Sequence, residues 1–154
     1  MDIYSFDETG FRIGCINGRI VITHTNTKHV YLTDPNNRDF ITSMECIWSD
    51  GSAIQPMIVL KGSVFLEKHF DNNMDNGVLF AQSDTGYSND KLGLIWLSHF
   101  NSQTINRTKG KYRLLVFDGR GSHLSGDFLV YCWQWDIIPF LLPSQYPLTS
   151  ATRR

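Results

Sequence analysis

The chain has 154 residues, a formal net charge of −1 at pH 7 and a hydrophobic fraction of 42%. This length suits one domain, and this composition excludes a disordered or fibrous chain. The small net charge argues against a protein that binds nucleic acid by charge alone, while it leaves open an enzyme with a local acidic site.

Short apolar runs predict strands in the first half of the chain. They cover residues 3–7, 19–23, 40–48, 53–60 and 78–82. The first run stops at Asp7, where the sequence DETG predicts a turn. An Asp-Gly pair at 50–51 separates the third and fourth runs and predicts a β-hairpin. Pro56 lies inside the fourth run, which therefore predicts an edge strand or a bulge.

Apolar residues recur at helical spacing after Asn89, which is the predicted N-cap of a helix over 89–104. Residues 112–117 show no alternation of apolar and polar side chains, which is typical of a strand buried on both faces. Residues 137–142 predict a last strand. Ser125 is the predicted cap of a second helix over 126–135. The apolar face of that helix consists of Phe128, Leu129, Cys132 and Trp133.

The order of these elements predicts an α/β fold with a mixed five-stranded sheet and helices on its faces. Its strands cover residues 3–7, 40–48, 53–60, 112–117 and 137–142. We expect the first three strands to pair antiparallel and the last two to join through right-handed helical crossovers. Three scattered cysteines, no signal peptide and no apolar run of membrane-spanning length predict one soluble intracellular domain.

Two aspartates are the strongest candidates for chemistry. Asp7 and Asp118 each end an apolar strand before a turn that contains glycine. Open α/β sheets bind ligands beyond the carboxyl ends of their strands, and two neighbouring carboxylates there suit a hard divalent cation. The alternative is that both are ordinary turn residues.

Other candidates are weaker. His123 lies five residues after Asp118 and could contact a phosphate or a metal-bound water, or it is simply a surface histidine at a helix start. Four cations in seven residues indicate either contacts with a phosphate backbone or simply a solvated surface loop. They are Arg107, Lys109, Lys111 and Arg113.

Several ordered segments together resemble the pogo-type DDE transposases, the DDE superfamily endonuclease domain of the mariner-like group. Residues 5–11 (SFDETGF) resemble the first signature of that family, and residues 114–124 (LLVFDGRGSHL) resemble the second. Residues 37–42, 56–62 and 83–94 (SDTGYSNDKLGL) match in order and spacing. The resemblance runs from about residue 3 to residue 143.

This resemblance implies an RNase H-like fold and a metal-dependent DNA endonuclease. It implies that Asp7 and Asp118 are catalytic residues that bind Mg²⁺ or Mn²⁺, with Glu8 and His123 as accessory residues. It further implies DNA as a partner, a nuclear location, no membrane contact, and a homo-oligomer or a full-length transposase as a protein partner.

The chain also departs from the family pattern. The family has a third acidic ligand shortly after the last strand, whereas no Asp or Glu follows Asp136 here, and Arg120 stands where a histidine is usual. We therefore expect an incomplete catalytic domain over residues 1–143 and a divergent tail over 144–154. The helix-turn-helix part that precedes the core in the family is not seen in this sequence.

Three hypotheses follow. The first is a nucleic-acid-binding remnant of a DDE transposase core whose DNA cleavage and strand transfer are impaired. The second is a domesticated DNA- or protein-binding module without catalysis. The third is a small-molecule or nucleotide domain that uses the same strand ends, although the sequence contains neither a GxGxxG nor a GxxxxGK[ST] loop.

Overall fold

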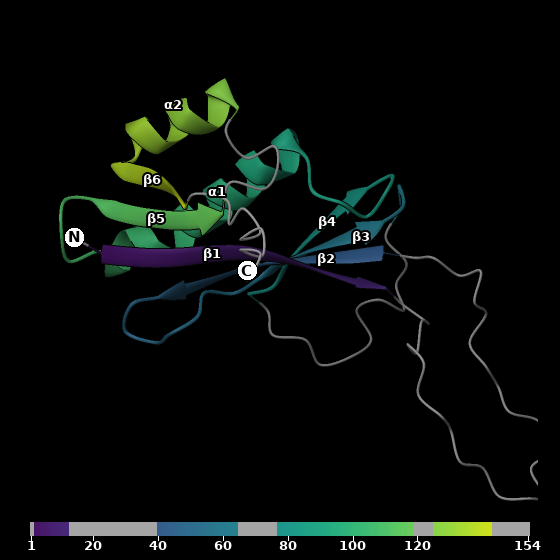
Figure 1. Ribbon diagram of the computed structural model, residues 1–154, viewed down its shortest axis with the longest axis horizontal. Helices are drawn as coiled ribbons and strands as arrows, with labels where there is room; N and C mark the ends of the chain where they lie inside the picture. The colour runs from purple at the N-terminus through teal and green to yellow at the C-terminus, as the bar shows by residue number, and fades with distance from the viewer. Residues whose placement is uncertain (1, 13–39, 65–76, 119–124, 143–154) are drawn as a thin grey trace, which may run out of the picture.

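The computed structural model describes residues 2–12, 40–64, 77–118 and 125–142 (Figure 1). The strands within these residues are β1 (Asp2–Arg12), β2 (Phe40–Trp48), β3 (Met57–Lys61), β4 (Leu79–Ser83), β5 (Arg113–Asp118) and β6 (Ile137–Leu142). The helices are α1 (Asp90–Thr104), the 3-10 turn η2 (Ile105–Arg107) and α2 (Gly126–Gln134). The predicted strand over 19–23 lies outside the described residues.

The strands form one sheet in the order β4-β3-β2-β1-β5-β6. β2 pairs antiparallel with β1 and β3, whereas the pairs β1–β5, β5–β6 and β3–β4 are parallel. All strands except β2 therefore run in one direction, and their carboxyl ends share one edge. The expected count of five strands is wrong by one, because residues 79–83 pair with β3 along its whole length.

The turn predicted in the first strand is also wrong, and of the two alternatives predicted from Pro56 one is wrong. The DETG sequence makes no turn, because β1 continues through residues 8–12 paired with the first residues of β2. Gly10 lies within this paired stretch, and the ring of Phe40 occupies the space that a Cβ would need there. Pro56 precedes β3, which is an internal strand rather than an edge. The other predicted alternative, a bulge, fits the structure, because the pairing with β2 shifts by one residue between Ile47–Ala53 and Met44–Met57.

The core lies between one face of the sheet and the two helices. Alternate residues of β1 and β5 point to it, and the ring of Phe6 packs 3.9 Å from that of Trp96 on α1. Phe117 of β5 contacts Phe128 of α2 on the same face. Asn89 caps α1 as predicted, accepting a hydrogen bond from the N–H of Leu92.

The second helix buries less than its sequence predicts. Ser125 caps α2 as expected, and Phe128 and Cys132 are buried. Leu129 and Trp133 are exposed, Trp133 by 85%, although the spacing places them on the apolar face. A nine-residue helix at the end of the layer contacts the sheet with one narrow stripe, so only one residue per turn reaches the core.

We predict that Cys46 and Cys132 do not react with a thiol reagent at pH 8 while the protein is folded. Burial raises the pKa of both thiols to about 12, so neither is a thiolate at that pH. The measurement is the rate of labelling with and without urea, in a Cys15→Ser background, since Cys15 lies outside the described residues. Rapid labelling of the folded variant would contradict the burial of both side chains.

Candidate functional site

Asp7 lies in the middle of β1 rather than at its end. It is exposed, pairs with Glu45 across the β1–β2 ladder, and its Oδ1 accepts a hydrogen bond of 2.8 Å from the N–H of Glu8. Although β1 continues, its parallel pairing with β5 stops at Ser5. Figure 1 shows β1 running on beside β2 past the end of β5.

Asp118 is the last residue of β5 and is also exposed. The parallel register pairs Ser5 with Val116, so two further residues along each strand bring Asp7 level with Asp118. Both aspartates alternate with buried residues and therefore face the side of the sheet away from α1. The β1–β5 ladder ends at the Ser5–Val116 pair, so the extrapolated register places Asp7 and Asp118 on the same face of neighbouring strands, two residues beyond the last paired residues.

Glu8 points to the opposite side of β1. Its Oε2 accepts a hydrogen bond of 2.7 Å from the hydroxyl of Ser88, which directly precedes the N-cap of α1. Glu8 therefore joins β1 to the start of α1, and its carboxylate is directed away from that of Asp7. The sequence contains no signal for this contact, since the two residues are 80 positions apart.

Glu45 is a further acid that sequence reasoning missed. It stands opposite Asp7 on β2, on the same face, and its Oε1 accepts a hydrogen bond of 2.8 Å from the hydroxyl of Ser43. Even so, within residues 2–12, 40–64, 77–118 and 125–142 no group of three or more His, Cys, Asp or Glu side chains is placed to hold a metal. His123 lies outside these residues.

The four cations of the basic cluster do not form one surface. Arg107 and Lys109 are exposed and lie 4.9 and 5.6 Å from the centre of the Trp48 ring, and Lys111 lies over Tyr112. Arg113 is buried, with 4% of its surface exposed. All four are near the amino ends of β1 and β5, at the edge of the sheet opposite the two aspartates.

Arg113 has a structural environment. Its guanidinium donates to Thr104 Oγ1 at 2.8 Å and to the carbonyl oxygen of Trp135 at 2.7 Å. Burial lowers the pKa of this group, although an arginine remains charged at neutral pH. The predicted contact of Arg113 with nucleic acid is therefore not available in this structure, because its charge is used to join α1 to the turn before β6.

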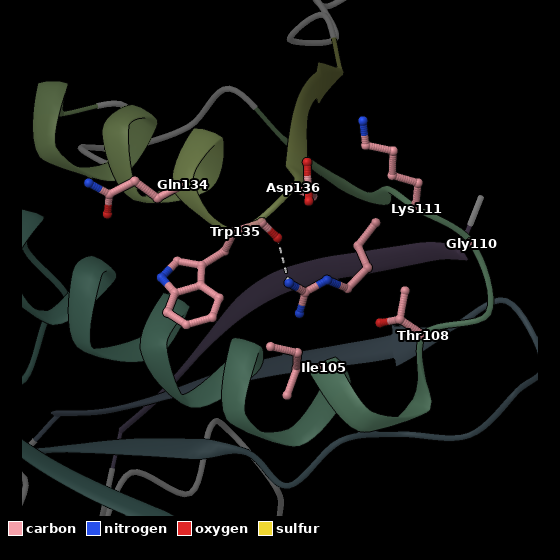
Figure 2. Close-up of a pocket in the computed structure, with 8 residues that line it drawn as sticks. Ile105, Thr108, Gly110, Lys111, Gln134, Trp135 and Asp136 are labelled. Carbon is pink, nitrogen blue, oxygen red and sulfur yellow. Dashed lines mark hydrogen bonds between the residues drawn. The ribbon is translucent and has the colours of Figure 1, made fainter.

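Figure 2 shows a cavity of about 310 Å³ beside this arginine. It is lined by Ile105, Thr108, Gly110, Lys111, Arg113, Gln134, Trp135 and Asp136. Asp136 has a φ of 53°, a left-handed conformation that aspartate tolerates better than most residues. The cavity lies at the amino end of β5, about 17 Å along that strand from Asp118.

A family model described as DDE superfamily endonuclease matches residues 37–150, which is most of the chain. This chain belongs to that family. The matched range includes Asp118, His123 and the basic cluster, whereas Asp7 and Glu8 precede it. Together with the observed sheet, the match confirms the expected α/β, RNase H-like class and the DDE resemblance.

One curated relative is a Cochliobolus lunatus protein named MFS-type transporter clz9. It is 32% identical over 143 residues, which is 92% of this chain but 16% of that protein. The chain thus spans about a sixth of the relative, whose name describes the whole of that protein. None of the described helices is both long and apolar enough to cross a membrane. No solved structure matches the chain.

We predict that Arg113→Gln lowers the free energy of unfolding by about 2–4 kcal/mol, because hydrogen bonds to a charged group contribute about 1.5–3 kcal/mol each. Urea denaturation measures this loss. Lys111→Gln is the matched control, since Lys111 is an exposed cation two residues away, and it should leave stability unchanged. Equal losses in both variants would show that the buried contacts of Arg113 are not the cause.

Proposed function

We propose that this chain is a transposase-like catalytic core that acts on DNA and cleaves it weakly. The observation that carries the proposal is the placement of Asp7 and Asp118 on one face of two adjacent parallel strands. Membership of the DDE superfamily endonuclease family supports DNA as the substrate. A nuclear location belongs to the same proposal, because the substrate is there.

The donor atoms of this site suit a hard divalent cation. Two exposed carboxylates on neighbouring strands repel each other, and Mg²⁺ or Mn²⁺ binds carboxylate oxygens together with waters and phosphate oxygens. We assign Asp7 and Asp118 as the ligands. When bound there, such an ion would polarise a DNA phosphodiester and lower the pKa of a water molecule.

The surrounding residues hold the first carboxylate in place. The N–H of Glu8 donates to Asp7 Oδ1, and the Ser88–Glu8 hydrogen bond ties that part of β1 to α1. Glu45 adds negative charge opposite Asp7, which favours a cation over an anion at this face. In this proposal Glu8 has an accessory role as a positioning residue, and His123 remains an accessory residue that would contact phosphate.

The weakness of the proposed cleavage comes from the ligand count. A two-metal site needs further oxygen ligands to hold both ions, and in the described residues no third acidic side chain joins Asp7 and Asp118. No Asp or Glu occurs between Asp136 and Arg154. We therefore propose that these residues alone support at most one well-held ion.

A second candidate is a DNA-binding module without catalysis, and one observation favours it. Arg107 and Lys109 form an exposed cation pair against Trp48, at the edge of the sheet opposite the aspartates. Arg107 is further held by a 3.0 Å hydrogen bond to the hydroxyl of Ser52. A cation pair held in this way suits contacts with the phosphate backbone at any sequence.

We predict slow nicking of a supercoiled plasmid that needs Mg²⁺ or Mn²⁺ and falls roughly tenfold or more in Asp7→Asn and in Asp118→Asn, the loss expected even for residues that only support metal ligands. Gel electrophoresis of nicked product against time measures it. Asp50→Asn is the control, since Asp50 is an exposed aspartate near the opposite edge. Nicking that all three variants retain would refute the assigned ligands.

We also predict that Arg107→Gln with Lys109→Gln weakens binding to duplex DNA and reduces the slope of log K against log salt by about 2, one for each phosphate that the variant no longer neutralises. Fluorescence anisotropy over a salt series measures the slope. Lys91→Gln, an exposed cation on α1, should leave it unchanged. The same slope in the double variant and the wild type would exclude this surface from DNA binding.

A further inference from the structure

The loop between β4 and α1, residues 83–88, is held tightly against the sheet. The hydroxyl of Thr42 on β2 donates a buried hydrogen bond of 2.9 Å to the carbonyl oxygen of Gly86. Gly86 has a φ of +80°, and a Cβ there would collide with the carbonyl oxygen of Phe40. The loop therefore needs glycine at this position, and its backbone is fixed by contacts with β2.

This loop presents one aromatic ring to solvent. Tyr87 stacks on Phe40 with ring centroids 4.3 Å apart and an interplanar angle of 29°, yet 54% of Tyr87 is exposed. Its backbone is bonded on both sides, since its carbonyl accepts from Ser83 Oγ at 2.7 Å and its N–H donates to Thr85 Oγ1 at 3.3 Å. The ring is thus backed by a second aromatic and presented on a fixed backbone.

The ring lies at the same edge of the sheet as the two aspartates but on the opposite face, because Phe40 has the parity of the buried residues Thr42 and Met44. The loop follows the carboxyl end of β4, which runs in the same direction as β1 and β5 (Figure 1). Tyr87 directly precedes Ser88, whose hydroxyl bonds to Glu8, the neighbour of Asp7. This path places the Cα atoms of Tyr87 and Asp7 within roughly 20 Å of each other, a span of about six nucleotides.

The charges beside the ring suit a nucleic acid strand. Arg12 of β1 pairs with Phe40 in the β1–β2 ladder and is exposed, and Lys61 lies next to Gly86 at the end of β3. Asp84 in the same loop offsets part of this positive charge. Charge alone would therefore hold a phosphate backbone only moderately, and the exposed ring supplies the contact that can discriminate.

We propose that Tyr87, backed by Phe40, is a stacking platform for an unpaired nucleobase of a DNA strand that passes round this edge of the sheet from the face of Asp7 and Asp118. The inference rests on the proposed function, because it takes DNA as the ligand. Every base has a flat π face, so stacking on a fixed tyrosine selects single-stranded over paired DNA with little preference for sequence. The platform thus predicts a preference for DNA with an unpaired end.

The test compares a blunt duplex with the same duplex that carries a six-nucleotide single-stranded extension with one 2-aminopurine. Binding is measured in EDTA, by anisotropy and by quenching of 2-aminopurine fluorescence. The wild type should bind the extended DNA more tightly and quench the fluorophore. Tyr87→Leu keeps an apolar contact with Phe40 but has no π face, so its affinity for the extended DNA should fall roughly 5- to 100-fold.

The controls separate this inference from the proposed function. Tyr87→Phe should retain both the affinity and the quenching, and Trp133→Ala, which removes a more exposed aromatic elsewhere, should change neither. If Tyr87→Leu, shown to be folded by circular dichroism, binds and quenches like the wild type, the platform is refuted while DNA binding stands. If the wild type binds neither DNA, the proposed function fails and the platform fails with it.

Discussion

The parallel ladder between β1 and β5 is the constraint on which the candidate site depends. Backbone hydrogen bonds set its register, and the burial of every second side chain sets which face each remaining residue takes. Phe6 and Phe117 anchor the two strands against α1 and α2, because they contact each other and the helical aromatics. A slip of one residue in this register would put Asp7 or Asp118 into the core face.

The two edges of the sheet have different roles. At the amino ends of β1 and β5, buried charges join elements together: Arg113 bonds to α1 and to the turn before β6, and Asp2 accepts hydrogen bonds from the N–H groups of Lys109 and Gly110. At the carboxyl ends, both aspartates are exposed and the loop over 83–88 presents Tyr87. Charged groups are thus buried in contacts between elements at one edge and are exposed at the other.

The sequence predicted elements better than it predicted which residues they bury. The spacing of Leu92, Ile95, Trp96 and Phe100 identified α1, although Ile95 is exposed. Asn89 and Ser125 cap their helices as expected. By contrast, the same kind of spacing placed Trp133 in the core, although it is exposed. Periodicity reports which residues share a helix face, whereas burial also depends on how much of that face another element covers.

The local sequence pattern by itself determined whether most elements are helices or strands, because propensity, capping and alternation act over a few neighbouring residues. It also identified the two aspartates as candidate site residues. Only the tertiary structure decided that residues 7–10 continue a strand, since the partner for that ladder is supplied by β2, more than 30 positions away. It likewise decided that Arg113 is buried, that Glu45 stands opposite Asp7, and that Ser88 bonds to Glu8. These are contacts between distant segments, and a short sequence window contains no information about them.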